Sequence, residues 1–181
     1  MTTDVERREF LALLGITPAS RLLEVDGVTQ AVPDESFDAV LCIDAIARVP
    51  DRGAALAAWA RAVKRGGRIL YTDPAIVAGL VTNEELATRS ATGFFVFSPQ
   101  GENESLIEFA GLRLLRADDA TDAVALAALR LGNERAGREA ELVAVEGREG
   151  YDAHQRFLEV THRLAAERRL ARIAFLAEKT P

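Results

Sequence analysis

Residues 37–72 read FDAVLCIDAIARVPDRGAALAAWARAVKRGGRILYT, and this stretch decides the fold. Phe37–Ile43 is nearly continuously apolar, as expected of a strand that helices cover on both faces. Asp51 is a good N-cap residue for a helix over Arg52–Lys64. Apolar residues recur three, four and seven positions after Leu56, so this helix has one core-facing stripe.

A second strand follows the helix directly. Gly66 and Gly67 are expected to end the helix, and Arg68–Thr72 is expected to form the strand. A strand, a helix and a strand joined by short turns are typical of a right-handed parallel βαβ unit. The stretch therefore predicts a parallel sheet.

The flanking sequence extends this alternation of strands and helices. The expected helices cover Asp4–Leu14, which Gly15 stops, then 83–89, 102–110, about 122–145 and 152–168. The other expected strands are Arg21–Val25, Leu112–Arg116 and Ile173–Ala177. Five strands alternating with helices predict an α/β layer fold, and no linker or repeat divides residues 1–181, so we expect a single domain.

Composition and charge exclude several classes of function. The chain has 181 residues, 22 Lys+Arg against 28 Asp+Glu, and a net charge of −6. Its pI near 5.1 argues against nucleic-acid binding, because phosphate backbones require a basic surface. No apolar run approaches the roughly 20 residues of a membrane helix, and the charged N-terminus has no signal core. The single cysteine, Cys42, favours a reducing compartment, so we predict a cytoplasmic protein.

Three segments together resemble a known family. Pro33–Asp51 is similar to the central stretch of class I S-adenosylmethionine-dependent methyltransferases of type 11, in which a P-D-x-S-F-D loop enters the fourth strand. Val63–Leu70 resembles the family's L-K-P-G-G turn, and Ala110–Leu115 resembles its A-G-F turn. The resemblance covers residues 31–181. It implies a Rossmann-like three-layer sandwich whose mostly parallel sheet ends in an antiparallel strand, and methyl transfer from S-adenosylmethionine to a small molecule.

The first strand region departs from the family pattern. Arg21–Val25 resembles the family's first strand, but the glycine-rich G-x-G-x-G loop is replaced by residues 26–30, with Gly27 as the only glycine. The chain then passes directly to the loop before the fourth strand. About two βα units, on the order of 60 residues, are therefore missing and the sheet is expected to be shortened. An exposed edge strand tends to pair with another chain, so we predict either a homodimer formed through Leu22–Val25 or poor solubility.

The resemblance implies cofactor contacts at the ends of the first and fourth strands. These contacts are assigned to Glu24, Asp26, Gly27, Ile43, Asp44 and Ala45. Glu24 would face the methionine part of S-adenosylmethionine, and Asp26 would lie near its adenine. Asp-Gly is also a common turn dipeptide, and Asp44 is equally suited to capping the following turn.

Substrate contacts are assigned to residues that follow the fourth and fifth strands. Arg48 stands where similar proteins often have histidine, and it would pair with an acidic substrate or simply be a solvated charge at a helix entry. Tyr71 and Asp73 would face the substrate side of the crevice, although Asp73 before Pro74 also suits a turn. No catalytic residue is assigned.

No metal site is predicted. His154 and His162 are eight residues apart, about 80° around a helix, and no ligand cluster surrounds them. Three functional hypotheses remain. The chain is a methyltransferase of a small molecule, or it is a methyltransferase-like module without catalytic activity that dimerises or binds a partner. The third is a non-methylating catalyst that reuses the remaining crevice.

Overall fold

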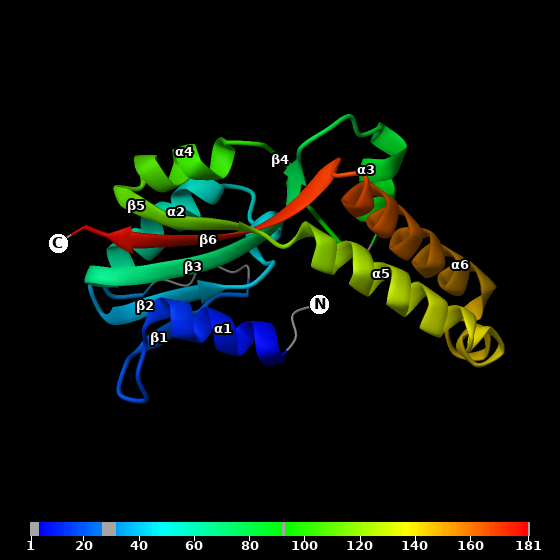
Figure 1. Cartoon of the computed structure of the whole chain (residues 1–181), viewed down its shortest axis with the longest axis horizontal. Coiled ribbons are helices and arrows are strands. Elements are labelled where there is room, and N and C mark those ends of the chain that lie inside the picture. Colours follow the sequence, from blue (N-terminus) through cyan, green and yellow to red (C-terminus); the bar gives the residue numbers. More distant parts are fainter. Residues whose placement is uncertain (1–3, 27–31, 92, 181) are drawn as a thin grey trace.

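A six-stranded sheet forms the centre of the protein (Figure 1). The structure, a computed structural model, describes residues 4–26, 32–91 and 93–180. Its strands are β1 (Leu22–Glu24), β2 (Phe37–Cys42), β3 (Val63–Val77), β4 (Ser98–Pro99), β5 (Leu112–Asp119) and β6 (Leu170–Lys179). The order across the sheet is β1-β2-β3-β6-β5, with the short β4 paired to the end of β3. The pairs among β1, β2, β3 and β4 are parallel, whereas β6 runs antiparallel to both β3 and β5.

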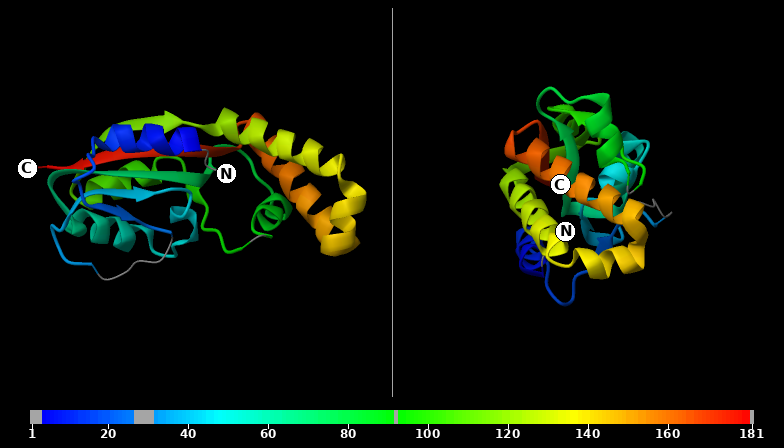
Figure 2. Two further views of the ribbon diagram at one scale, coloured as in Figure 1. Left: turned by 90° about the horizontal axis from the view of Figure 1, so that it is seen from below. Right: turned by 90° about the vertical axis from the view of Figure 1, so that its right-hand side faces the viewer.

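Helices cover both faces of this sheet (Figures 1 and 2). The described helices are α1 (Asp4–Leu14), the 3-10 turn η1 (Ile46–Arg48), α2 (Arg52–Ala62), α3 (Asn83–Arg89), α4 (Glu102–Phe109), α5 (Thr121–Ala136) and α6 (Glu139–Ala166). Of these, α1 covers one face, and α2 and α4 cover the other. On one face, Phe10 and Leu14 of α1 pack against Leu41 of β2. On the other face, Leu56 and Trp59 of α2 pack in a second, larger core. The three-layer α/β sandwich predicted from the sequence is confirmed.

The sequence prediction places the end of α2 too late. The helix ends at Ala62, and β3 begins at Val63, so Gly66 and Gly67 lie within the strand. Gly67 has a different role from the one predicted. A Cβ atom there would lie 2.6 Å from Val63 Cγ2 and 2.7 Å from the carbonyl oxygen of Asp38, so the close approach of β2 requires glycine.

The N-cap and the helix stop predicted from the sequence are confirmed. The Asp51 side chain accepts a hydrogen bond of 2.8 Å from the backbone N–H of Ala54. Gly15 follows α1 with a φ of 67°, a left-handed conformation that glycine adopts without steric cost. The start of α2 and the end of α1 are therefore set by the residues next to them in the sequence, Asp51 and Gly15.

β1 lies at one edge of the sheet. Within the part of the chain that the structure describes, its only pairing is with β2, in the register Leu22 to Ala39. The chain passes from β1 to β2 through residues 25–36, with no strand or helix among the described residues of that connection. Among the described residues the sheet has six strands where five were expected, because the two-residue β4 also pairs with β3.

Two long helices, α5 and α6, form a hairpin that projects beyond the carboxyl ends of the parallel strands (Figure 1). The helix expected over about 122–145 ends at Ala136, and α6 bends at Gly147, whose φ is 76°. Arg135 of α5 pairs with Glu146 of α6 at 2.6 Å and holds the far end of the hairpin together. Among the described residues, no helix combines the length and apolar character needed to cross a membrane.

Candidate functional site at the carboxyl ends of the parallel strands

The end of β1 carries two exposed carboxylates. Glu24 is the last residue of β1, and Asp26 lies two positions after it. The backbone N–H of Val25, between them, donates a hydrogen bond of 2.9 Å to the carbonyl oxygen of Leu41 in β2. Glu24 forms an ion pair of 2.5 Å with Arg7 of α1, and both side chains are about half exposed. Gly27, which was assigned to the same site, lies outside the described residues. The structure thus places Glu24 and Asp26 at the predicted edge, within reach of solvent.

Asp44 follows β2 in an unusual backbone conformation. Its φ is 56°, in the left-handed region that few non-glycine residues occupy. The carboxylate does not cap the next turn, because it accepts hydrogen bonds of 2.7 Å from the Thr72 hydroxyl and of 2.7 Å from Nε of Arg172. Thr72 Oγ1 in turn accepts the Asp44 backbone N–H at 2.7 Å. The side chain is therefore tied to β3 and β6.

Ile43, Ala45 and Arg48 flank Asp44 on the same segment. Ala45 is buried in the core, and Ile43 is partly buried against the cluster that α1 covers. Arg48 is exposed, and its guanidinium lies 5.9 Å from the ring centroid of Phe95. Only Arg48 of these three presents a polar side chain to solvent.

Tyr71 lies within the core. Its side chain has no exposed surface, stacks on Phe175 at 5.1 Å between ring centroids, and donates a hydrogen bond of 3.2 Å to Oδ1 of Asn103. Burial raises the pKa of Tyr71 well above its ordinary value. In this structure Tyr71 supports the sheet from inside and does not reach the surface of a crevice.

Asp73 is also fully buried, and it organises a polar network that the sequence did not reveal. Its carboxylate pairs with Arg52 and accepts hydrogen bonds from the Ser98 hydroxyl at 3.0 Å and from Asn103 Nδ2 at 2.9 Å. Arg52 also donates to the carbonyl oxygen of Val96. The Arg52–Asp73 network therefore fixes the segment before β4 over the carboxyl end of β3.

Arg172 of β6 is a further site residue that sequence reasoning missed. Its side chain is 5% exposed and pairs with both Asp44 and Glu6 of α1. These contacts join α1, β2 and β6 at one point beside the strand ends. Because β6 is antiparallel, the start of this strand meets the carboxyl ends of β2 and β3.

Arg89, the last residue of α3, was also missed. It is 6% exposed, donates a hydrogen bond of 2.9 Å to the Thr161 hydroxyl of α6, and lies 5.0 Å from the ring centroid of Phe157. Desolvation by burial lowers the pKa of the Arg89 guanidinium to about 10, although Asp44 opposes this shift. A cation this deeply buried has no sequence signature, because α3 alone reads as an ordinary short helix.

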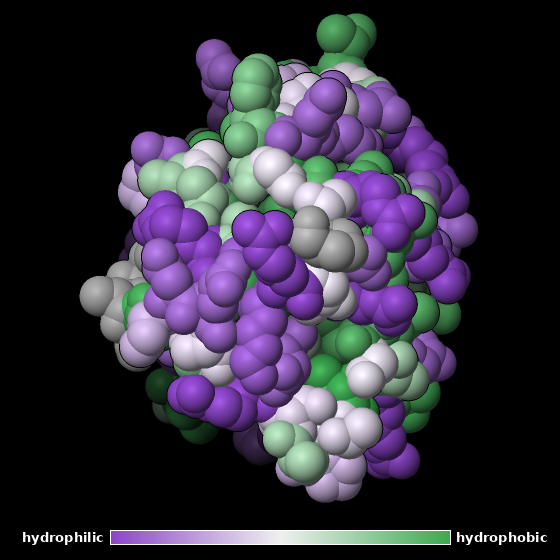
Figure 3. Space-filling model, turned by 90° about the vertical axis from the view of Figure 1, so that its left-hand side faces the viewer, coloured by the Kyte–Doolittle hydropathy of each residue, from purple (hydrophilic) through white to green (hydrophobic). Residues whose placement is uncertain are grey.

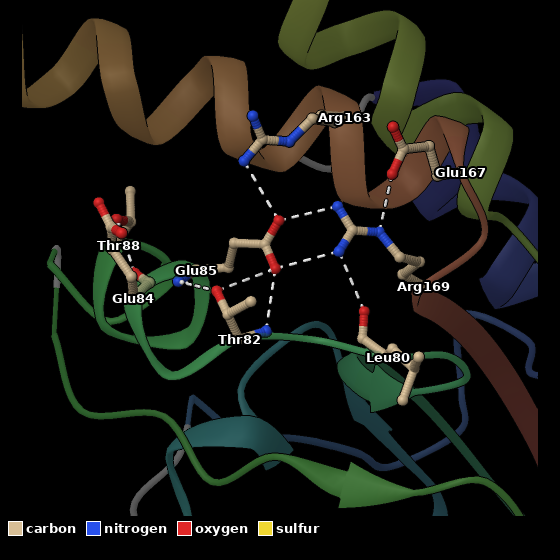
Figure 4. Close-up of polar contacts among 8 residues, drawn as sticks. All are labelled: Leu80, Thr82, Glu84, Glu85, Thr88, Arg163, Glu167 and Arg169. Carbon is tan, nitrogen blue, oxygen red and sulfur yellow. Dashed lines mark hydrogen bonds and ion pairs between the residues drawn. The ribbon is translucent and has the colours of Figure 1, made fainter.

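Glu85 fixes α3 in place (Figure 4). Its carboxylate accepts hydrogen bonds from Arg169 at 2.8 and 3.1 Å and from Arg163 at 3.2 Å, and it closes a capping box with Thr82. The hydrogen bonds from Arg169 and Thr82 lower the pKa of Glu85 to about 2. The Glu85 clamp, meaning Glu85 with Arg163, Arg169 and Thr82, thus positions the helix that carries Arg89.

The opposite end of the sheet has a hollow whose cationic side chains are paired with acidic side chains. Figure 3 shows this end of the molecule, where hydrophilic residues cover much of the surface. A hollow of 390 Å³ there includes Lys64, Arg65 and Arg68, and each of these cations has an acidic partner. Among the described residues, no three His, Cys, Asp or Glu side chains group as metal ligands. The unusual electrostatics therefore lie at the carboxyl ends of the strands.

Part of the chain is similar to known proteins. Residues 7–71 match the methyltransferase domain family. The methyltransferase GfsG of Streptomyces halstedii is 33% identical over 95 residues, which is 49% of this chain and 33% of that protein. This chain therefore spans about a third of the curated relative that it matches.

Solved structures share the fold at low sequence identity. A Galdieria sulphuraria protein assigned as a sarcosine dimethylglycine methyltransferase has a TM-score of 0.71 and 22% identity, over 82% of this chain and 55% of that one. The mycolic acid cyclopropane synthase CmaA1, crystallised with S-adenosylhomocysteine, has a TM-score of 0.81 and 13% identity, over 99% of this chain and 86% of that one. The resemblance inferred from the sequence is confirmed. The chain has the class I methyltransferase fold, and its residues 7–71 match the methyltransferase domain family.

Proposed function

We propose that this protein binds S-adenosylmethionine at the carboxyl ends of β1, β2 and β3 and transfers its methyl group to a small molecule. One observation carries the proposal. The parallel register of β1 and β2 brings the ends of both strands to one edge, where Glu24 ends β1 and where Asp26 and Asp44 follow the two strands. Ligands of open α/β sheets bind outside such carboxyl ends.

The residues at this edge fit the proposed cofactor in their chemistry. The exposed carboxylates of Glu24 and Asp26 are hydrogen-bond acceptors, which suit the ammonium and the adenine amino group of S-adenosylmethionine. Glu24 would have to share or release Arg7, with which it forms an ion pair of 2.5 Å. The apolar side chain of Ile43 and the backbone of Ala45 complete the proposed wall, as the resemblance implies.

Catalysis would consist mainly of positioning. When bound, the cofactor supplies a methyl group on a positively charged sulfur, and the acceptor atom gains that methyl group and releases a proton. The protein must hold the acceptor in line with the sulfur and exclude water. Arg48, exposed beside Phe95, is the proposed contact for an acidic acceptor. Tyr71 and Asp73 would act indirectly, since both are buried beneath that surface.

Calorimetric titration with S-adenosylmethionine and S-adenosylhomocysteine tests the proposal. We expect saturable binding at micromolar concentration, and a thermal melt should show about 2.7 kcal/mol of added stability at 100 times Kd. Glu24→Gln should weaken binding, whereas Glu9→Gln, an exposed substitution on α1, is the matched control. Absence of both heat and melting shift at millimolar ligand would refute the cofactor proposal.

A second function is a dimerising or partner-binding module without methyl transfer. It is favoured by the engagement of Glu24 with Arg7 and of Asp44 with Arg172, which leaves fewer free groups for a cofactor. The edge strand β1 would pair with β1 of another copy through Leu22–Val25. Light scattering coupled to gel filtration tests this: a dimer that Leu23→Lys converts to a monomer supports it, and a monomeric wild type contradicts it.

The proposed setting is a reducing cytoplasm. Cys42 is the single cysteine of the chain and is buried, and burial raises the pKa of its thiol to about 12. Because the thiol stays protonated and the thiolate is the reactive form, Cys42 serves as a packing residue. Neither the proposed enzyme nor the proposed module requires Cys42 chemistry.

A further inference from the structure

An exposed pair of opposite charges lies at the carboxyl end of β1. Nη2 of Arg7 in α1 and Oε1 of Glu24 in β1 are 2.5 Å apart, and the two side chains are 43% and 54% exposed. Within the described part of the chain, each of these side chains has the other as its one polar partner. A positive and a negative group therefore face solvent side by side, at the edge where the cofactor is proposed to bind.

The first turn of α1 is held over the strand ends by contacts other than this pair. Glu6 forms an ion pair with Arg172 of β6, whose side chain is buried. Phe10 and Leu14, four and eight positions after Glu6, are buried against the sheet, so one face of α1 contacts the sheet along the length of the helix. The backbone of Arg7 is therefore fixed beside β1 independently of its own ion pair.

Glu24 lies on the face of the sheet that α1 covers (Figure 1). Side chains alternate along a strand, so Glu24 shares a face with Leu22. Leu22 packs against the core cluster beneath α1, whereas Leu23 packs against the core on the other face. The strand alternation and the packing of α1 thus bring the two charges together from separate elements.

We infer that Arg7 and Glu24 together bind the amino-acid end of S-adenosylmethionine, with Arg7 on its carboxylate and Glu24 on its ammonium group. That end of the cofactor has one negative and one positive group on the same carbon atom, which matches the two charges of the pair. This inference rests on the proposed function. It assigns the cofactor carboxylate to Arg7, a residue to which neither the sequence analysis nor the proposed function gave a cofactor contact.

The pair can bind the ligand without separating completely. The ion pair joins one guanidinium nitrogen to one carboxylate oxygen. A guanidinium has five N–H donors in a planar fork, and a carboxylate accepts through two oxygens, so both groups have capacity for a further partner. An exposed ion pair is also weak, so a small rearrangement of the two side chains costs little. Glu24 would then share Arg7 with the cofactor instead of releasing it.

Calorimetric titration with two related ligands tests the inference. S-adenosylhomocysteine has the amino-acid group, whereas 5′-methylthioadenosine keeps the adenosine and the thioether sulfur but lacks that group. We expect the wild type to bind S-adenosylhomocysteine about tenfold more tightly than methylthioadenosine. Arg7→Gln should raise the Kd of S-adenosylhomocysteine about fivefold, since it removes a partly exposed charged contact, and should leave the Kd of methylthioadenosine unchanged.

Arg8→Gln is the matched control for Arg7→Gln. Arg8 is the next residue on α1 and is exposed, so both Kd values should stay at those of the wild type. Ligand-free thermal melts of the two variants should lie close to the wild-type curve, because the Arg7–Glu24 pair is itself exposed. Glu24→Gln should also weaken the binding of S-adenosylhomocysteine and spare methylthioadenosine.

Three results would overturn the inference. Tighter binding of S-adenosylhomocysteine by Arg7→Gln would mean that Arg7 competes with the cofactor for Glu24. An unchanged Kd of S-adenosylhomocysteine in Arg7→Gln, or an equal change in both Kd values, would mean that Arg7 does not contact the amino-acid group. In these two cases the wild type still binds the ligand and the proposed function stands. If the wild type binds neither ligand, the proposed function and the inference fail together.

Discussion

Arg52 and Arg89 are buried to nearly the same extent but in opposite electrostatic settings. Arg52 is 4% exposed, pairs with Asp73, and donates hydrogen bonds to the Ser98 hydroxyl and to the carbonyl oxygen of Val96. Arg89 is 6% exposed and has one hydroxyl and two rings. The difference teaches that equal burial does not mean equal electrostatic compensation. The chain supplies a carboxylate to Arg52, whereas it offers Arg89 a hydroxyl and aromatic rings.

Asp73→Asn should convert Arg52 into a cation like Arg89, with the largest effect on stability. Breaking a buried ion pair by removal of one partner costs about 3–5 kcal/mol. We expect a decrease of that size in the free energy of unfolding, measured by urea denaturation. Asp118→Asn is the control, because its ion pair with Arg116 is exposed and should contribute less than about 1 kcal/mol. A loss under 1 kcal/mol for Asp73→Asn would contradict the comparison.

Glu85→Gln tests how firmly α3 holds Arg89, with a smaller loss than for Asp73→Asn. The pKa of Glu85 is lowered from 4.5 to about 2 in the folded protein, so its contribution is complete above about pH 5. The stabilising contribution of Glu85 is lost as the pH falls from 4.5 through 2. Thermal melts across this range should show a steeper acid loss for the wild type than for Glu85→Gln. Glu84→Gln, exposed on the same helix, should keep the wild-type profile, and an identical profile in Glu85→Gln would refute the clamp.

Asp51→Ala weakens the start of the helix that carries Arg52. The lost N-cap bond to the backbone N–H of Ala54 should cost about 1 kcal/mol in urea denaturation. Asp51→Asn retains a capping oxygen and should recover most of that loss. If the alanine and asparagine variants are equally stable, the cap does not contribute to placing Arg52.

Thr161→Asp should convert Arg89 into a residue like Arg52. The new carboxylate would lie where the Thr161 hydroxyl now accepts from Arg89. A buried pair roughly balances its own desolvation, so we expect a change of less than about 1 kcal/mol in unfolding free energy. Urea denaturation measures this change, and a loss above about 3 kcal/mol would show that the new carboxylate does not pair with Arg89.

Much of the fold could be predicted because it depends on local patterns. The apolar run of β2, the Asp51 cap and the stop at Gly15 are each specified within a few residues. The end of α2 was misplaced because Gly66 and Gly67 suit both a helix stop and a close approach between strands. That choice depends on the carbonyl oxygen of Asp38 in the neighbouring strand, which the local sequence does not specify.

The candidate site could be predicted only in part. Glu24, Asp26 and Asp44 lie at the expected strand ends because strand register places them there. Tyr71 and Asp73 lie deeper than the expected crevice surface, since Phe175 and Arg52 approach them from other elements. Arg89 and Arg172 could not be predicted, because their roles depend on partners more than 70 positions away in sequence.

The position of β6 has a consequence for how the protein folds. Although it comes last in the sequence given, β6 lies between β3 and β5, and its residue Glu178 pairs in register with Arg68 of β3. During synthesis, β5 has no strand to join it to the earlier part of the sheet until residues 170–179 have left the ribosome. Such pairing over a long sequence separation is slow. The nascent chain must therefore keep one edge of β3 and one edge of β5 from pairing wrongly until β6 has been made, so closure of the sheet depends on this long-range pairing.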